Sequence, residues 1–180
     1  MRMRVRLLGL LAATALLLPS PAFAQSSWLY EIRAGVLVHD VPIVACCRTE
    51  DSVSLNAELA FAPSLPLFGG AIRPVLGGSF TPGGQTSFVY LDARWEWSGS
   101  LFFFGVGVGP AIQTGDNLYV SSSGHKALGS RVLFHIPLEI GIQVTPQHRI
   151  SAYYEHVSNG YTSSPNPGMD NLGIRLSHRF

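Results

Sequence analysis

The sequence predicts an all-β fold, an eight-stranded antiparallel transmembrane β-barrel of the outer-membrane type, and three observations lead to it. The 180 residues are 47% hydrophobic and only 13% charged, which is about half the charged share of an ordinary soluble domain. The chain opens with the pattern of an export signal. Eight segments then alternate between apolar and polar residues with a period of two. An apolar exported chain without a second spanning helix can satisfy its backbone in a bilayer by closing strands into a barrel.

Composition excludes several other classes of protein. A net charge of +1 comes with no basic stripe to neutralise phosphates, so no nucleic-acid partner is expected. Two cysteines are too few for a disulfide-stapled fold, and 19 glycines and 12 prolines oppose a coiled coil. Disordered chains are rich in charge and poor in apolar residues, which is the opposite of this composition.

Residues 1–24 have the organisation of a secretory signal peptide. Arg2, Arg4 and Arg6 form a basic start, residues 7–18 form a short apolar stretch, and Ala-Phe-Ala at 22–24 is a cleavage pattern. The apolar stretch is too short for a membrane helix, which needs about 20 residues. We therefore expect two parts, a signal peptide at 1–24 and a single barrel at 25–180, exported to the bacterial outer membrane.

Eight alternating segments of ten or more residues follow, and turn-rich breaks separate them. They lie near 28–40, 51–62, 71–80, 85–97, 101–114, 127–143, 147–159 and 169–180. The breaks carry Pro, Gly, Ser or Asn, as in 63–66 and 164–168. Spanning strands need about 9–11 residues, so each segment is long enough for one crossing. Twelve strands would leave too little chain for the strands and their loops.

Parity along the segments predicts which face points inward. In the sixth segment Phe134, Ile136 and Leu138 share one face, whereas His135 and Glu139 occupy the other. The polar faces of all segments together hold six acids and six arginines: Glu31, Glu58, Asp92, Glu96, Glu139 and Glu155 against Arg33, Arg73, Arg94, Arg131, Arg175 and Arg179. A balanced set without lysine fits a narrow interior plugged by ion pairs, whereas a soluble sandwich has no reason to balance its outward charges.

Polar side chains meet on the outward face of the last two strands, near the outer rim. His156 and Ser158 share the parity of the lipid-facing residues, and Asp170 opens the last strand on the same face. A serine hydroxyl becomes a nucleophile when an imidazole accepts its proton and a carboxylate orients that imidazole. Asn159 or Asn166 could then stabilise an oxyanion. On spacing alone, a polar cluster that meets lipid headgroups is the alternative reading.

A resemblance favours the catalytic reading. His-Val-Ser-Asn at 156–159, followed by Pro-Asn-Pro-Gly-Met-Asp at 165–170, resembles the C-terminal signature of the lipid A 3-O-deacylase family (PagL type). Members are eight-stranded outer-membrane barrels that act on lipopolysaccharide, and their acid follows the histidine by fourteen residues, as Asp170 does here. The resemblance implies Ser158 as nucleophile, His156 as base, Asp170 as orienting acid and Asn166 as oxyanion donor. The chain departs from the best-known members at Asp170, where they carry Glu.

The expected function is therefore that of an outer-membrane esterase, a carboxylic ester hydrolase that removes the 3-O-linked hydroxyacyl chain of lipid A. Lipopolysaccharide is the expected substrate, the protein is membrane-embedded, and assembly as a homodimer is left open. No cofactor and no metal is expected, because no metal-ligand spacing of Cys or His occurs. For Cys46 and Cys47 the sequence leaves open a bridge between neighbours, which would be strained, and free or intermolecularly paired thiols.

Two other functions remain as alternatives. One is a non-catalytic small outer-membrane barrel with a structural or adhesion role, which the short outer loops disfavour. The other is an outer-membrane phospholipase, which shares the Ser and His chemistry but belongs to barrels of about twelve strands.

Overall fold

The protein is a closed β-barrel in the computed structural model, which describes residues 28–115, 120–122 and 124–180. The expected signal peptide at 1–24 lies outside the described residues. The described strands are β1 (Leu29–Val38), β2 (Val53–Phe61), β3 (Leu65–Leu67), β4 (Gly70–Phe80), β5 (Phe88–Ser98), β6 (Phe102–Gln113), β7 (Val132–Gln143), β8 (His148–Ser158) and β9 (Met169–Arg179).

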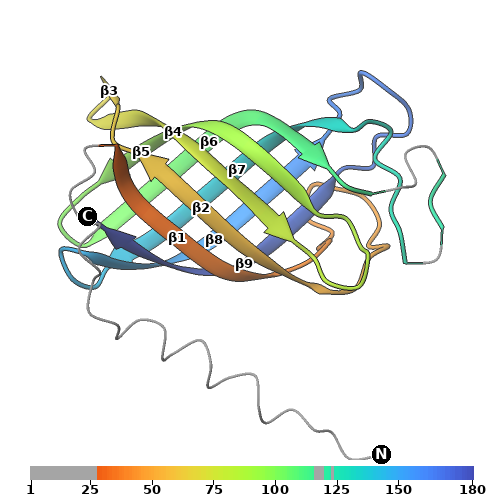
Figure 1. Cartoon of the computed structure of the whole chain (residues 1–180), viewed down its shortest axis with the longest axis horizontal. Helices are drawn as coiled ribbons and strands as arrows, with labels where there is room; N and C mark the ends of the chain where they lie inside the picture. The colour runs from red at the N-terminus through yellow and green to blue at the C-terminus, as the bar shows by residue number, and fades with distance from the viewer. Residues whose placement is uncertain (1–27, 116–119, 123) are drawn as a thin grey trace, which may run out of the picture.

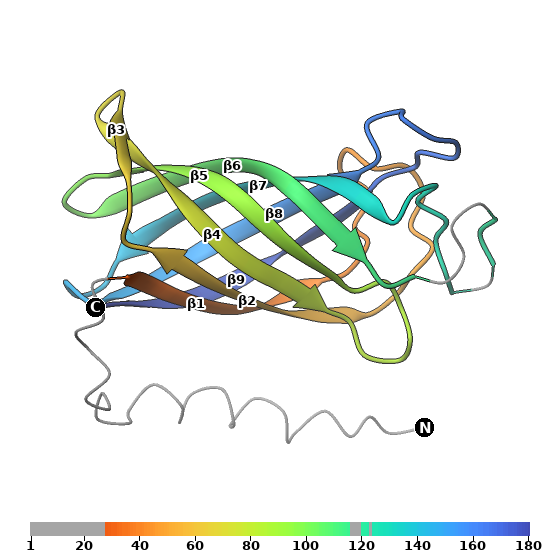
Figure 2. The same cartoon turned by 45° about the horizontal axis from the view of Figure 1, so that its top comes forward.

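Antiparallel pairing closes eight of these strands into a ring (Figure 1). β1 pairs with both β2 and β9, each later strand pairs with its predecessor from β9 back to β4, and β2 pairs with β4. The short strand β3 pairs with β4 alone and stands off the barrel at one end (Figure 2). The predicted eight-stranded barrel is confirmed. β3 was not predicted, because the prolines at 63 and 66 mark this stretch as a break.

The two ends of the barrel differ. The described residues of the loops 39–52, 81–87, 114–131 and 159–168 gather at one end, which we call the outer end. β1 begins and β9 ends at the opposite, inner end (Figure 1). Among the described residues, no helix is long and apolar enough to cross a membrane.

The sixth predicted segment begins too early. β7 starts at Val132 and not near residue 127, because 127–131 belong to an outer loop. Ala127 and Leu128 are nevertheless buried, and Leu128 packs in an apolar cluster with Tyr90 and Leu133. Loop residues that cover the outer end of the core therefore continue the apolar pattern of the strand, and sequence periodicity does not separate the two.

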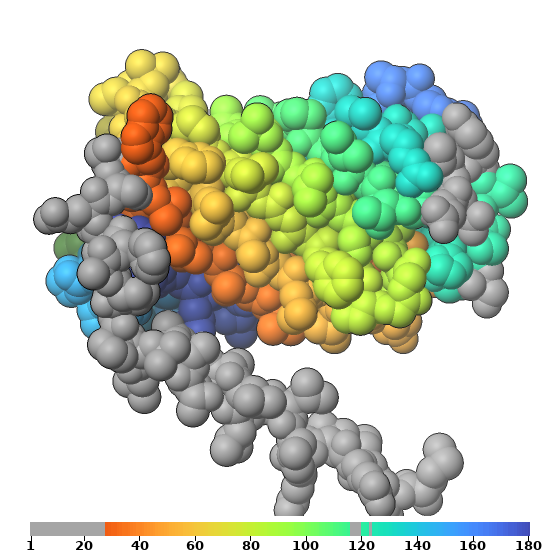
Figure 3. Space-filling view, viewed as in Figure 1, coloured from red at the N-terminus to blue at the C-terminus, as the bar shows by residue number. Residues whose placement is uncertain are grey.

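Side chains alternate across the wall as parity predicts. On β7, Phe134, Ile136 and Leu138 are exposed, whereas His135 and Glu139 are buried. The space-filling view shows a continuous outer wall over β1 to β6 between the two ends (Figure 3). Exposed apolar residues around a charged interior reverse the arrangement of a soluble barrel and identify the outer-membrane type.

The interior is held together by a network of ion pairs. Arg33 lies near its centre, and its guanidinium nitrogens approach four carboxylates, those of Glu31, Glu58, Glu96 and Glu139, at 2.8 to 3.5 Å. Removing one partner of a buried pair costs about 3–5 kcal/mol because the other charge stays buried and unpaired. The network therefore favours one register of the strands over its neighbours.

The same pattern repeats around this centre. Arg94 and Arg175 each contact Glu58 at 2.8 Å. His135 lies between two carboxylates, 3.0 Å from Asp92 and 3.2 Å from Glu155. Buried positive and negative groups thus alternate through the middle of the barrel, as the balance of acids and arginines predicts.

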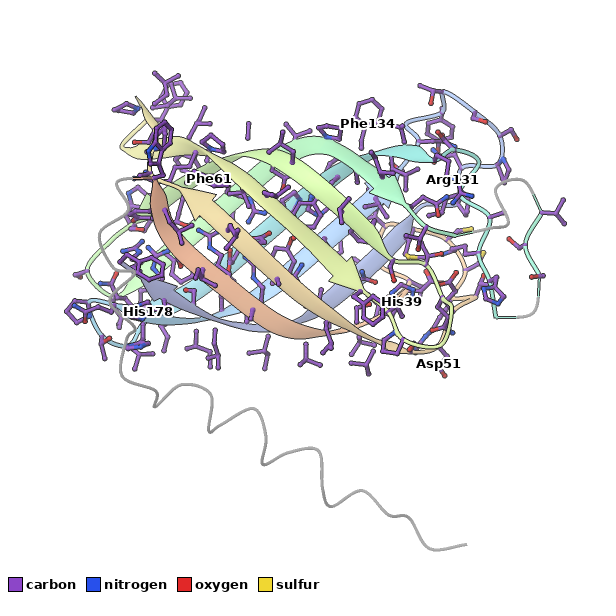
Figure 4. The ribbon with its side chains drawn as sticks, in the orientation of Figure 1. His39, Asp51, Phe61, Arg131, Phe134 and His178 are labelled. Carbon is purple, nitrogen blue, oxygen red and sulfur yellow. The ribbon has the colours of Figure 1, made fainter. Side chains whose placement is uncertain are left out.

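Two of the six predicted interior arginines lie elsewhere. Arg131 precedes β7 at the outer end (Figure 4), where it is exposed and donates to the carbonyl of Gly115 at 2.8 Å. Arg73 is half-buried near the inner end, where its guanidinium lies 3.8 Å from the ring centre of Tyr30. Both have inward parity but lie close to a rim. The sequence reading did not include Arg149, which is buried and contacts Glu96 at 2.7 Å.

The orientation of the wall predicts a depth-dependent response to a charged residue on β7. Leu138→Arg places a cation at the middle of the strand and should lower the free energy of unfolding by about 2–4 kcal/mol, whereas Val144→Arg, on the same face just past the inner end of β7, should cost about 0–1 kcal/mol. Urea unfolding of protein refolded into phospholipid vesicles measures both. Equal costs for the two variants would contradict the assigned membrane-facing surface.

Candidate active site

Two neighbouring strands bring the predicted histidine and acid together at the outer end. β8 ends at Ser158 and β9 begins at Met169, and their antiparallel register sets His156 directly opposite Asp170. The intervening loop 159–168 reverses the chain, so residues fourteen apart in sequence become cross-strand neighbours on one face. This face is the outward one, since Tyr154, His156 and Ser158 alternate with the buried residues of β8.

A short hydrogen bond joins His156 and Asp170. The Nδ1–H of His156 donates to Oδ1 of Asp170 across 2.6 Å. The His156 side chain is 14% exposed and that of Asp170 is fully buried. In a neutral imidazole whose Nδ1 carries the proton, Nε2 is an acceptor. The pair therefore presents a base that is oriented by a carboxylate.

The buried carboxylate of Asp170 is surrounded by donors. The hydroxyl of Tyr154 donates to Oδ1 at 2.9 Å. The backbone N–H groups of Ile43, Val44 and Ala45 donate to Oδ2 at 3.2, 2.5 and 2.8 Å. We call these three N–H groups the amide cradle. Successive backbone N–H groups that converge in this way form an anion-binding concavity.

The amide cradle explains a burial that parity does not predict. Asp170 shares the outward face with Leu172, which is exposed, yet Asp170 is fully covered because the 39–52 loop folds over it. Sequence reasoning missed this part of the site because the cradle consists of main-chain groups. The apolar side chains of Ile43 and Val44 point to no such role.

Ser158 lies two residues beyond His156 on the same face of β8, about 7 Å away from Cα to Cα. It is half-buried, and its cross-strand neighbour on β7 is Phe134, whose ring points away from the barrel (Figure 4). Its hydroxyl makes no hydrogen bond within the described part of the chain. Catalytic hydrogen bonds are often long without substrate and tighten when it binds.

Gly168 lets the outer loop lie against the histidine. Its φ is +66°, and a Cβ built on it would lie 2.9 Å from Cε1 of His156. Any side chain at this position would push against the imidazole ring. A glycine is therefore required both by the backbone conformation and by the ring that it contacts.

The two candidate oxyanion residues have different surroundings. The side-chain amide nitrogen of Asn159 donates to the carbonyls of Leu128 and Pro165, at 2.9 Å each, on the buried side of the wall. The carboxamide oxygen of Asn166 accepts the backbone N–H of Asn159 at 3.0 Å. The amide nitrogen of Asn166 makes no hydrogen bond within the described residues, so its two N–H bonds remain available to a ligand.

Other reactive side chains lie in the first outer loop. Cys46 and Cys47 are exposed and unbridged, with their sulfurs 2.8 Å apart. The hydrogen bond with the Cys47 thiol raises the pKa of Cys46. Among the residues that the structure describes, no group of three or more His, Cys, Asp or Glu side chains is placed to hold a metal ion.

The sequence model of the lipid A 3-O-deacylase (PagL) family matches residues 64–179, more than half of the chain. The chain belongs to the lipid A 3-O-deacylase family. The matched region contains His156, Ser158 and Asp170, whereas the amide cradle at 43–45 precedes it. The family match therefore covers the three candidate side chains but not the main-chain groups that bind Asp170.

A curated relative and two solved structures resemble parts of the chain. Lipid A deacylase PagL of Bordetella bronchiseptica is 31% identical over 87 residues, 48% of this chain and 46% of the relative, so the chain spans about half the length of the relative it matches. The crystal structure of the outer membrane enzyme PagL superposes with a TM-score of 0.62 at 16% identity, covering 83% of this chain and 99% of that one. Neisserial surface protein A superposes at 0.52 with 9% identity, over 86% and 98%. These two superpositions show a common barrel fold.

The contacts of Asn159 predict a structural role for its side chain. Asn159→Ala leaves the carbonyl of buried Leu128 without its donor, at a cost of about 1–3 kcal/mol, and should loosen the loops 114–131 and 159–168. We expect faster nicking of these loops by added protease while the barrel still migrates as a folded, heat-modifiable band. Ser164→Ala, an exposed change in the same loop, is the control. Equal resistance of the two variants would show that Asn159 does not hold the loops.

Proposed function

We propose that this protein is an outer-membrane esterase that hydrolyses the 3-O-linked hydroxyacyl chain of lipid A. Ser158 is the nucleophile, His156 the general base and Asp170 the acid that orients it. The observation that carries the proposal is the 2.6 Å hydrogen bond between His156 and buried Asp170, on the same outward face as Ser158. Family membership and the activity in the name of the Bordetella relative support it.

The position of the site suits a lipid ester. Ser158 lies at the outer end of β8, and the exposed residues Phe134, Ile136 and Leu138 continue the same side of the wall along β7. An acyl chain that lies against these residues would carry its ester at the level of Ser158. Polar side chains on a lipid-facing surface cost free energy. Here they lie at the boundary between sugar and acyl chains, where an ester reaction would need them.

The first half of the proposed reaction forms an acyl-enzyme. Nε2 of His156 takes the proton of the Ser158 hydroxyl as Oγ attacks the ester carbonyl carbon. The carboxylate of Asp170 stabilises the imidazolium that forms and keeps Nδ1–H directed toward itself. The negative charge that develops on the carbonyl oxygen meets the N–H groups of Asn166. The intermediate then collapses, and His156 returns the proton to the departing 3-hydroxyl oxygen of the sugar.

Water completes the cycle. His156 takes a proton from a water molecule that attacks the acyl carbon, and the second intermediate releases the fatty acid and restores the Ser158 hydroxyl. The hydrogen bonds that link Asp170, His156 and the attacking oxygen, and the N–H groups of Asn166 that meet the oxyanion, serve in both halves. Asn159 keeps a supporting part, since its backbone N–H donates to the carboxamide oxygen of Asn166 and restrains that side chain.

A non-catalytic barrel and a phospholipase are the competing functions. The eight-stranded fold disfavours the phospholipase, which belongs to barrels of about twelve strands, but it does not distinguish an enzyme from a non-catalytic barrel. The oriented His156, together with a Ser158 hydroxyl that makes no hydrogen bond to the described residues, favours an enzyme. The homodimer considered from the sequence remains a prediction.

Replacing the nucleophile tests the proposed activity directly. Ser158→Ala should leave a folded barrel and lower lipid A deacylation by about a thousandfold or more, because attack chemistry is lost while binding remains. Mass spectrometry of lipid A from a host that lacks such an enzyme, expressing either the wild type or the variant, measures the loss of one hydroxyacyl chain. Ser164→Ala is the control. Intact lipid A with deacylated phospholipids would identify the phospholipase instead.

Substitutions at Asp170 test the orientation of the imidazole. In Asp170→Asn the amide oxygen can still accept from the amide cradle, but its NH2 then faces Nδ1 of His156 and forces the proton onto Nε2, where it blocks the base. Asp170→Glu keeps the charge, although its extra methylene must be fitted beneath the 39–52 loop. We therefore expect turnover to fall in the order wild type, Glu, Asn. An Asn variant as active as the wild type would remove Asp170 from the mechanism.

A further inference from the structure

The amide cradle depends on the shape of the loop that carries it, and one carboxylate closes that loop. Oδ2 of Asp40 accepts the backbone N–H groups of Thr49 at 2.7 Å and Glu50 at 3.1 Å. The chain between residues 40 and 50 is thereby tied into a ring, with the cradle residues 43–45 at one side of it. Asp40 has a φ of +51°, a conformation that persists only when its surroundings fix it.

Asp40 also anchors this ring to the barrel and to a second loop. Its backbone N–H donates to Oδ1 of Asn171 on β9 at 3.0 Å. Its Oδ1 pairs at 2.5 Å with Nζ of Lys126, the one lysine of the sequence, and both side chains are 2% exposed or less. A buried ammonium needs such a partner, because its charge has lost its water. The cations of the central ion pairs are arginines and His135, whereas Lys126 pairs with Asp40 in a separate polar cluster at the outer end.

Glu50 joins a third loop to the same cluster. Its Oε1 accepts the backbone N–H of Lys126 and its Oε2 accepts that of Thr86, both at 2.8 Å. Burial alone would raise the pKa of Glu50, but hydrogen bonds from His39, Lys126 and Thr86 hold it below its usual range. His39 lies inside the outer end of the barrel (Figure 4). We call Asp40, Glu50 and Lys126 the loop latch.

We propose that Asp40, held by Lys126, is a positioning residue for the catalytic acid. It fixes the 40–50 loop so that the amide cradle binds Oδ2 of Asp170 and leaves Oδ1 to His156. The inference rests on the proposed role of Asp170 in the reaction. It assigns to the loop latch a part in catalysis that acts through Asp170 and touches no reacting atom.

The chain between the latch and the acid is short. Val41 follows Asp40 directly, and its N–H donates to the carbonyl oxygen of Asp170 at 2.8 Å. Two residues later the cradle begins with Ile43, and beyond it the N–H of Cys46 donates to the carbonyl of Pro167. A loop released at Asp40 therefore releases the main-chain contacts on both sides of the carboxylate. A displacement of about 1 Å at a reacting group costs about a hundredfold in rate.

A double-mutant cycle separates this role from a structural one. Asp40→Asn places an NH2 group against Lys126 and should lower kcat for lipid A deacylation by about ten- to hundredfold, with KM within about twofold. In the Asp170→Asn background the same change should alter kcat by less than about twofold, because the group through which it acts is already gone. Equal losses in both backgrounds would overturn the inference.

Matched variants complete the cycle, all in the full chain purified in detergent. Lys126→Met should repeat the loss of Asp40→Asn, and Lys126→Arg should restore most of the rate because it keeps the cation. Asp51→Asn is the control, since Asp51 lies in the same loop but is exposed and pairs with Arg48. An Asp40→Asn variant as active as the control would overturn the inference.

Two further measurements protect the test from misfolding and from failure of the proposed function. If Asp40→Asn does not fold, Val44→Pro takes its place, because it removes one N–H of the cradle and should lower turnover relative to Asp51→Asn. Amide hydrogen exchange needs no activity: the N–H groups of 43–45 should exchange at least about tenfold faster in Asp40→Asn than in Asp51→Asn. Unchanged protection would overturn the inference, whereas an inactive wild type with the expected exchange would overturn only the proposed function.

Discussion

Pairing of charge inside a narrow barrel is the constraint on which the rest of this structure depends. The outer wall is apolar, so the polar half of every alternating strand must face a small interior. The desolvation cost of a charge enclosed there is offset only when the charge has partners of opposite sign. Arg33, placed among four carboxylates, shows how the requirement is met. Because the partners come from different strands, the same contacts that neutralise the charges also fix how the strands are aligned.

Alignment of β8 with β9 in turn creates the candidate site. The register that sets His156 opposite Asp170 is the one that places Glu155 and Arg175 correctly inside, since inward and outward residues move together when a strand shifts. The outward-facing Asp170 is stabilised by hydrogen bonds rather than by ion pairs with arginine. Asp170 is enclosed by donors from β8 and from the 39–52 loop, so a carboxylate on the lipid-facing side of the wall has no unsatisfied oxygen.

Period-two alternation and a short motif carried the sequence prediction a long way, and both have clear physical limits. Alternation identifies a face, so it placed His156 and Ser158 outward and Glu139 inward. It carries no information about distance from a rim, which is why Arg131 and Arg73, which lie near the two rims, were not separated from the arginines of the central ion pairs. It also counted the buried loop residues Ala127 and Leu128 as strand. The motif pointed to the candidate side chains at 156–170, of which the structure pairs His156 with Asp170, but main-chain donors such as the N–H of Val44 leave no residue type to recognise.

The outward placement of Ser158 has a consequence for how a lipid would reach it. An internal cavity would require an acyl chain to leave its neighbours and thread through an opening before any reaction. On the external wall, beside Phe134 and Ile136, the lipid of the proposed reaction would arrive by lateral diffusion within its own leaflet and would keep its hydrocarbon environment throughout. Encounter then becomes a two-dimensional process governed by the surface density and order of the surrounding lipids. The packing and fluidity of the leaflet would thus set the rate at which lipid meets Ser158.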